Sequence, residues 1–269
     1  MTLDRELSVA REAASLGADI IAEIYAKDFA VEWKGEDDPV TVADRAANAA
    51  IVGLLRERFP DDAVCAEESG ADENLAAIQR GGRVWFVDPV DGTKEFIAKN
   101  GEFCVMVGLA IDGEAALGCV VAPAWQRAIW GSIEHGAFES REGRAPTALR
   151  VREPEGRVRM VASRSRPDWR VERVAAAVGG DSRPCGSVGL KVALVAATEA
   201  DLYVLPSGGA KLWDACAPHA IALSAGAKVT DARGENIVYA HAGLGLDHGI
   251  VVASTTLHAR AIDALRSCR

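Results

Sequence analysis

A run of short apolar segments in the middle of the chain constrains the fold most, because each has the length and composition of a β-strand. Two of the segments are separated by Asp112-Gly113, a signal for a tight hairpin turn. The expected strands cover residues 63–66, 84–87, 103–111, 115–121, 128–132 and 136–139. Their succession predicts a meandering sheet that must bury its apolar side chains against helices.

Two helices are expected before these strands. Apolar residues recur at three- and four-residue steps from Leu3 to Ile24, the period of a helix that packs on one side. Thr41 is followed three residues later by Asp44, an approximate capping box that opens a second helix running through Leu55. Pro60 ends this second helix.

A charged stretch rich in proline and glycine, residues 140–157, separates two halves of different pattern. We place the boundary near Glu155, which gives an α+β half over residues 1–155 and an α/β half over residues 156–269. The second half alternates expected strands at 158–162, 202–205 and 250–253 with expected helices at 168–178, 187–197 and 214–225. The whole is therefore expected to be an α/β protein with stacked layers of helix and sheet.

Composition excludes several classes of protein. Among 269 residues, 30 Lys and Arg oppose 39 Asp and Glu, and this net charge of −9 disfavours binding to a nucleic-acid polymer. The longest apolar run, Phe103 to Ile111, is far shorter than the ~20 residues of a membrane helix. The N-terminal residues show no signal peptide, and the six cysteines lack metal-ligand spacing, so we expect a cytoplasmic protein with buried thiols. Whether it is a monomer or a homodimer is left open.

The segment Trp85 to Phe96 carries the strongest chemical signal. A buried strand ends in Asp88, Asp91 and Gly92, which places carboxylates and free backbone N–H groups at one edge of the sheet. Such an edge suits a metal ion and a phosphate, and a metal would let this acidic chain accept an anionic substrate. The same Asp-Pro and Asp-Gly pairs also fit simple turn formation.

Other acidic residues follow the same pattern. Glu67 and Glu68 come directly after the expected strand at 63–66, and alternation along a strand directs one of them toward the site and the other toward solvent. Asp214 lies at the start of an expected helix, where the role of N-cap would also explain it. Carboxylates at strand and helix ends form the oxygen-rich ligand set that Mg²⁺ prefers.

Four strings, in this order and spacing, resemble the lithium-sensitive, magnesium-dependent inositol monophosphatase superfamily over nearly the whole chain. They are Asp38 to Asp44 (DPVTVAD), Ala66 to Ser69 (AEES), Trp85 to Phe96 (WFVDPVDGTKEF) and Leu212 to Asp214 (LWD). The continuation DGTKEF, followed by Asn100-Gly101-Glu102-Phe103, is similar to the bacterial 3'(2'),5'-bisphosphate nucleotidase branch, called CysQ.

The resemblance implies a layered αβαβα sandwich of the inositol monophosphatase and fructose-1,6-bisphosphatase type. It also implies two to three Mg²⁺ ions and direct attack of water on phosphorus without a phosphoenzyme. Thr93 and Asp44 would form a hydrogen-bonded pair that prepares this water together with Glu67, while the N–H groups of Gly92 and Thr93 hold the phosphate. The implied metal ligands are Glu67, Asp88, the Val90 carbonyl, Asp91 and Asp214.

Four further residues are candidate substrate contacts. Ser187 and Lys191 lie where the branch carries a Gly-Ser-Ser-Leu-Lys segment, although the serines are displaced here. An N-cap followed by a solvated lysine would also explain this pair. Ser163 and Arg166 fall in a segment that resembles Ser-Arg-Ser-His, and an arginine in place of the histidine could bind a second phosphate.

The resemblance implies hydrolysis of a small phosphate ester, the 3'-phosphate of adenosine 3',5'-bisphosphate, to give AMP and phosphate. Because Arg166 and the displaced serines depart from the branch pattern, an inositol or sugar phosphatase is the alternative. A catalytically silent protein of the same fold is disfavoured, since every position at which a carboxylate ligand is implied holds one.

Overall fold

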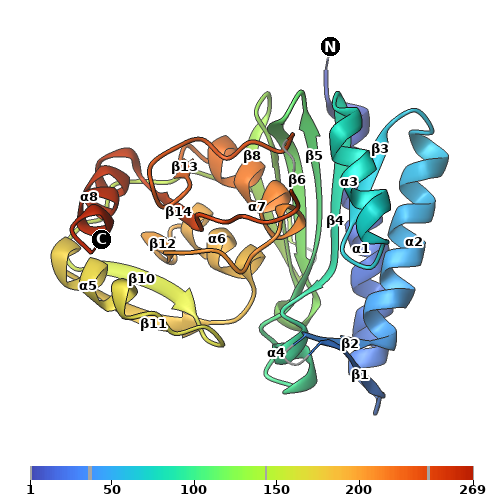
Figure 1. Ribbon diagram of the computed structural model, residues 1–269, viewed down its shortest axis with the longest axis horizontal. Coiled ribbons are helices and arrows are strands. Elements are labelled where there is room, and N and C mark those ends of the chain that lie inside the picture. The colour runs from blue at the N-terminus through green and yellow to red at the C-terminus, as the bar shows by residue number, and fades with distance from the viewer. Residues whose placement is uncertain (1, 36–37, 143, 241–242, 269) are drawn as a thin grey trace.

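The structure is a computed structural model that describes residues 2–35, 38–142, 144–240 and 243–268. Its helices and sheets are stacked in five layers (Figure 1). Helices α1 (Asp4–Tyr25) and α2 (Val42–Arg58) form the first layer, against the large sheet. They confirm both predicted N-terminal helices, and the capping box of Thr41 and Asp44 is present. Beside them, β1 (Val31–Gly35) and β2 (Asp38–Thr41) pair as two antiparallel strands.

The second layer is a seven-stranded sheet that confirms the predicted meander. Its first two strands are parallel and all later neighbours are antiparallel. In spatial order the strands are β3 (Ala63–Ala66), β4 (Arg83–Asp91), β5 (Cys104–Ile111), β6 (Glu114–Ala122), β7 (Arg127–Ser132), β8 (Gly136–Arg141) and β9 (Thr147–Leu149). The sequence pattern had not indicated β1, β2, β9, α3 (Ala71–Arg80), α4 (Thr93–Ile97) or η1 (Pro123–Trp125).

The remaining layers come from the second half of the chain. Helices α6 (Val188–Ala196) and α7 (Leu212–Ser224) lie between the two sheets, while α5 (Trp169–Val178) and α8 (Thr255–Arg266) cover the outer face of the smaller sheet (Figure 1). In spatial order the smaller sheet contains β11 (Gly180–Cys185), β10 (Val158–Ser163), β12 (Leu202–Leu205), β14 (Ile250–Ala253) and β13 (Lys228–Thr230). The layer order is the expected αβαβα sandwich.

Three helix starts differ slightly from the expected ranges, and β11, β13 and α8 had not been predicted. Asp168 and Ser187 are the N-caps of α5 and α6, so each helix begins one residue later than expected. Helix α7 begins at Leu212, two residues earlier than expected. No described helix is long and apolar enough to cross a membrane.

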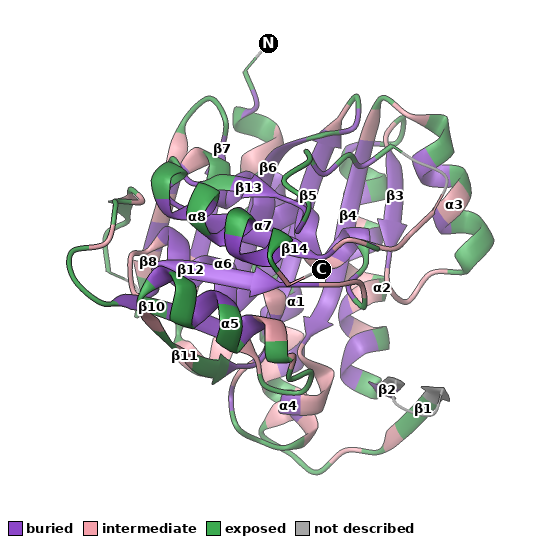
Figure 2. Ribbon diagram, turned by 60° about the vertical axis from the view of Figure 1, so that its left-hand side comes forward, coloured by how far each residue is buried: buried purple, intermediate pink, exposed green. Residues whose placement is uncertain are grey.

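The proposed division near Glu155 falls between the two sheets. The last strand of the large sheet ends at Leu149 and the first strand of the smaller sheet begins at Val158. Helices α6 and α7 nevertheless share one apolar cluster with both sheets. Figure 2 shows that buried residues dominate the large sheet and the layer next to it. The two halves therefore bury a common core.

Glycines on the large sheet allow α7 to approach it closely. Gly108 and Gly118 are paired across β5 and β6. A Cβ atom on Gly118 would lie 2.5 Å from the Cα of Ala217, and one on Gly108 would lie 2.6 Å from the backbone nitrogen of the same residue. Backbone atoms in a packed layer move little, so these positions exclude any side chain.

Gly118→Ala is therefore expected to lower the free energy of unfolding by at least about 2 kcal/mol, as overpacked cores do. Urea unfolding followed by circular dichroism measures this change. Gly53→Ala in α2 is the control, because a Cβ atom there meets nothing within 4 Å. That variant should be stabilised by about 0.5–1 kcal/mol through helix propensity. A Gly118→Ala protein as stable as the wild type would contradict the packing described.

Candidate functional site

A pocket of about 340 Å³ lies where the ends of β4 and β10 meet the first residues of α4, α6 and α7. Residues from both halves of the chain line it. The structure gathers all but one of the predicted site residues here: Glu67, Asp88, Val90, Asp91, Gly92, Thr93, Ser163, Arg166, Ser187, Lys191 and Asp214. The remaining one, Asp44, contacts the pocket through Thr93.

An irregularity in β4 explains how Asp88 and Asp91 reach the same pocket. On a regular strand, residues three apart point to opposite faces. Here Asp88 pairs with Met106 and Asp91 with Cys104, so β4 carries one extra residue, as in a β-bulge. Asp88 Oδ1 accepts a hydrogen bond of 3.0 Å from the Val90 N–H. The strand thus continues past the predicted end at Val87, and the bulge turns both carboxylates toward the pocket.

The carboxylates of the pocket raise one another's pKa. Burial raises the pKa of Asp88 well above its usual value, and the charges of Glu67, Asp91 and Asp214 raise it further. Burial, together with the charge of Asp91, raises the pKa of Asp214 to about 7. Burial also raises the pKa of Asp91, against the lowering effect of the Lys191 charge. The site therefore concentrates negative charge that a bound cation would neutralise.

The oxygen atoms that line the pocket are suitable ligands for a hard divalent cation. Carboxylate and carbonyl oxygens line the pocket beside a solvent-accessible space. Within the described residues, no three acidic, histidine or cysteine side chains are close enough to hold an ion as they stand. The fit consequently rests on the oxygen ligands and on the mutual repulsion of buried carboxylates.

Asp214 is not the N-cap that its position in the sequence had also allowed. Helix α7 begins at Leu212, which makes Asp214 its third residue, and Asp214 Oδ2 accepts a hydrogen bond of 2.8 Å from the Lys211 N–H. This is the reciprocal half of a capping box. The bond fixes the carboxylate at the first turn while the side chain lines the pocket.

Thr93 and Asp44 form the contact that the resemblance implied. Thr93 Oγ1 lies 3.3 Å from Asp44 Oδ1 and 3.1 Å from the Val90 carbonyl oxygen. The other oxygen of Asp44 accepts hydrogen bonds from the N–H and the hydroxyl of Thr41, at 2.8 and 2.6 Å. The capping box of α2 therefore also orients Asp44 toward the pocket.

The side chains of Ser187 and Lys191 form hydrogen bonds with other groups of the protein. Ser187 is the N-cap of α6, as the sequence had also allowed, and its Oγ lies 2.5 Å from Asp91 Oδ2. The alternative interpretation of Lys191 as a solvated lysine is wrong, since Lys191 is 2% exposed. Its ammonium donates to the carbonyls of Cys185, at 3.2 Å, and Ser187. The other residues of α6 are apolar and the helix lies between two sheets, so the Lys191 side chain is buried at the wall of the pocket.

The other two predicted substrate contacts lie at the rim. Ser163 ends β10, and the exposed Arg166 follows it and donates to the Gly209 carbonyl. Sequence reasoning had not assigned several other lining residues to the site, among them Lys211, Glu95 and Tyr203. Lys211 could have been found as the neighbour of the LWD string and Glu95 as part of DGTKEF, whereas Tyr203 is hidden inside an apolar strand.

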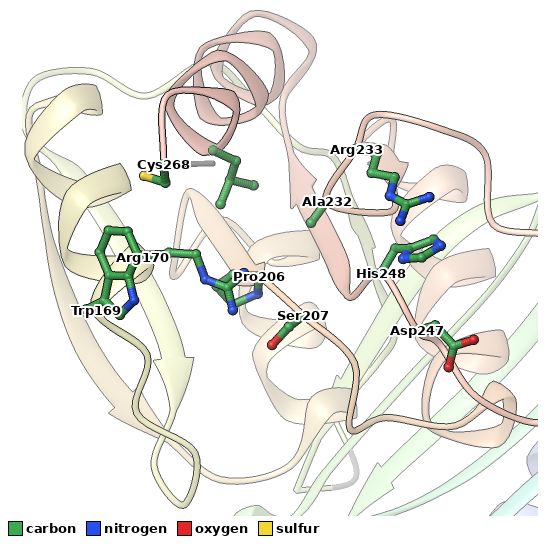
Figure 3. A pocket seen from close by; sticks show the side chains of 10 residues that line it. Trp169, Arg170, Pro206, Ser207, Ala232, Arg233, Asp247, His248 and Cys268 are labelled. Atoms are coloured by element: carbon green, nitrogen blue, oxygen red, sulfur yellow. The ribbon is translucent and has the colours of Figure 1, made fainter.

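A larger hollow of about 690 Å³ lies elsewhere, between α5, α8 and the segment around His248 (Figure 3). Figure 3 shows the guanidinium of Arg170 pointing into it, with Arg233 and His248 on the far side. Asp247 is the one carboxylate among its described lining residues, and no predicted site residue lies there. Its side chains do not form the oxygen set of a divalent-cation site.

Fold and pocket together define a class of protein. The chain belongs to the inositol monophosphatase family, whose profile matches residues 2–269. Among solved structures it is similar to the inositol monophosphatase of Anabaena (Nostoc) sp. PCC 7120, with a TM-score of 0.81, 25% identity, and coverage of 99% of this chain and 97% of that one. The predicted family and fold are confirmed.

Within this family the chain resembles nucleotidases. It is 36% identical to the 3'(2'),5'-bisphosphate nucleotidase CysQ of Escherichia coli O157:H7 over 239 residues, 88% of this chain and 93% of the relative. It is 27% identical to the 3'(2'),5'-bisphosphate nucleotidase 1 of Dictyostelium discoideum, with 94% of each chain covered. The solved CysQ of Bacteroides thetaiotaomicron has a TM-score of 0.79 and 28% identity, over 93% of this chain and 97% of that one.

Proposed function

We propose that this protein is a Mg²⁺-dependent phosphomonoesterase that removes the 3'-phosphate of adenosine 3',5'-bisphosphate and yields AMP and phosphate. The observation that carries the proposal is the convergence of Glu67, Asp88, Asp91 and Asp214 on one pocket. The bisphosphate nucleotidases among its relatives support the choice of substrate.

Two to three Mg²⁺ ions would be held by these four carboxylates and by the Val90 carbonyl. When bound, Mg²⁺ supplies positive charge to the phosphate oxygens and the leaving group, and it makes water more acidic. The carboxylates fit this task because their burial and mutual repulsion favour a cation in the pocket. Ordinary Mg²⁺ ligands are oxygens of this kind.

The chain's own groups position the reactants. Thr93 Oγ1 would donate a hydrogen bond to Asp44 and accept one from the attacking water, while Glu67 accepts the other proton of that water. The new P–O bond forms as the bond between phosphorus and the 3'-oxygen breaks, and the 3'-oxygen takes up a proton by way of solvent. Asp44 keeps its orientation through its two bonds to Thr41. The N–H groups of Gly92 and Thr93 hold the phosphate. A Cβ atom on Gly92 would lie 2.7 Å from the Glu102 carbonyl oxygen, so only glycine fits there.

The second phosphate would be bound by residues at the rim. Arg166 is exposed and lines the pocket, as does Ser163. A guanidinium can bind a phosphate in a bidentate manner, with two N–H groups donating to two phosphate oxygens. Ser187 and Lys191 line the pocket on the α6 side, where the Lys191 ammonium adds positive charge. We assign these four residues to substrate binding.

Arg166→Ala is expected to raise KM for adenosine 3',5'-bisphosphate and to spare a nucleoside monophosphate, because only the bisphosphate loses a charge-assisted bond. A loss of ~1.5–3 kcal/mol corresponds to roughly one to two decades in kcat/KM. Steady-state kinetics on both substrates measure the difference. Equal losses on the two substrates would point to structural damage, and no loss would remove Arg166 from the site.

Phosphate release over a panel of nucleoside bisphosphates and inositol phosphates, each with Mg²⁺, tests the choice of substrate. We expect kcat/KM to be highest for adenosine 3',5'-bisphosphate. A preference for an inositol or sugar phosphate would overturn the proposed substrate and leave the phosphatase chemistry intact.

We also place the enzyme in the cytoplasm. All six cysteines are free thiols, as in a reducing compartment.

A further inference from the structure

Glu102 lies between two glycine turns of the pocket, although no role described above uses its side chain. A Cβ atom on Gly92 would lie 2.7 Å from the Glu102 carbonyl oxygen, and one on Gly186 would lie 2.8 Å from the same oxygen. Gly92 precedes α4, and Gly186 belongs to the turn between β11 and α6. Glu102 is therefore packed against both halves of the chain at the edge of the pocket.

The Glu102 carboxylate joins the two halves. Arg164 binds it with two hydrogen bonds, from Nη2 to Oε1 at 2.6 Å and from Nε to Oε2 at 2.8 Å. Oε2 also accepts the N–H of Gly186 at 2.6 Å. The backbone N–H of Arg164 donates to the Cys185 carbonyl at 3.2 Å. Charge-assisted bonds of this paired kind are among the strongest and most directional in proteins.

The turn that Glu102 holds ends at Asp91. Ser187 has a φ of 58°, a left-handed conformation that a residue with a side chain keeps only when its surroundings impose it. In this conformation, Ser187 Oγ lies 2.5 Å and the Gly189 nitrogen 2.7 Å from Asp91 Oδ2. Both donors engage the same oxygen. They fix the rotation of the carboxylate and do not occupy Oδ1.

We propose that Glu102 is a positioning residue which, by holding the Gly186–Ser187 turn against Arg164, sets the orientation in which Asp91 binds the metal. This rests on the proposed function, in which Asp91 is a metal ligand. Groups that orient a ligand in this way typically change metal affinity or activity by about 10–100-fold when they are removed. Glu102 itself is not among the lining residues of the pocket.

Binding of Mn²⁺ alone to the full chain tests the proposal, with free Mn²⁺ measured by electron paramagnetic resonance and no substrate present. Mn²⁺ takes the same oxygen ligands as Mg²⁺. We expect Glu102→Gln and Arg164→Gln to weaken Mn²⁺ binding by about 10–100-fold, with unchanged circular dichroism. Arg159→Gln is the matched control. It breaks a bidentate pair that lies entirely within the second half, between Arg159 and Asp201 at 2.7 and 3.0 Å, and should leave Mn²⁺ binding unchanged.

Asp91→Asn shows whether Glu102 acts through Asp91. In that background, Glu102→Gln should add no further loss, because two changes that act on one group are not additive. Wild-type Mn²⁺ affinity in Glu102→Gln, an equal loss in Arg159→Gln, or a further loss in the Asp91→Asn background would each overturn the proposal. Mn²⁺ binding does not depend on the identity of the phosphate ester. A failure of the proposed substrate would therefore show only in the phosphate-release panel.

Discussion

Asp88→Asn is expected to lose nearly all phosphatase activity and, without metal, to unfold at a higher temperature than the wild type. The amide preserves the volume of the side chain but removes the charge that binds the cation, so kcat/KM should fall at least about 100-fold, or about 2.7 kcal/mol. Because Asp88 is 2% exposed and faces other carboxylates, its charge also destabilises the metal-free fold.

The stability that Asp88→Asn gains without metal depends on pH, because the pKa of Asp88 differs between the folded and unfolded states. The folded-state pKa of Asp88 lies above that in the unfolded chain, so its penalty is complete at alkaline pH and shrinks as pH falls. At pH 8 we expect Asp88→Asn to gain on the order of 1 kcal/mol, or about 2–4 °C in Tm, and to gain nothing below about pH 4. Differential scanning calorimetry in EDTA measures both.

Asp231→Asn is the matched control for Asp88→Asn. Asp231 is similarly buried, at 9% exposure, and accepts the N–H groups of Arg233 and Glu235, away from the candidate site. That variant should keep its activity and gain no stability in EDTA. Near-normal turnover of Asp88→Asn at saturating Mg²⁺ would remove Asp88 from the ligand set.

Removal of Mg²⁺ is expected to abolish phosphate release, and re-addition of Mg²⁺ is expected to restore it. The pocket has no histidine or thiolate ligand among its described lining residues that would favour a softer metal. Without a cation, its carboxylates repel a phosphate dianion. The measurement is phosphate release by dialysed enzyme as Mg²⁺ is titrated, with circular dichroism to show that the fold persists. Full activity in excess EDTA, in protein shown to be free of metal, would overturn the proposed mechanism.

Local signals were sufficient where the relevant interactions span only a few residues. The capping box at Thr41 and Asp44 was readable because both partners lie in one turn of α2. Three elements show the limit of such signals. Helix α3 was missed because Leu75 and Ile78 are its only apolar side chains larger than alanine, too few to show a helical period. In addition, β4 was predicted to end at Val87, and Asp214 was placed at the start of α7.

Lys191 shows what a local pattern leaves open. Its position after an N-cap predicted a helix correctly, and helical lysines are usually solvated. The neighbouring residues of α6 are apolar on every side, however, which is typical of a helix buried between layers. That composition was the available signal for the burial of Lys191, but the sheets that cover α6 come from distant parts of the chain.

The sequence by itself determined the helices and strands with clear periodicity, the order of the family strings and the oxygen-rich chemistry of the candidate ligands, since these depend on residue identity and short-range spacing. The tertiary structure alone decided which of these groups meet. A bulge turns Asp88 and Asp91 to one side, and the packing of two halves brings Glu102 onto the N–H of Gly186, 84 positions away. Such contacts are set by layers that bury a shared core, and a local pattern can indicate that an element is buried but not which distant residues it will meet.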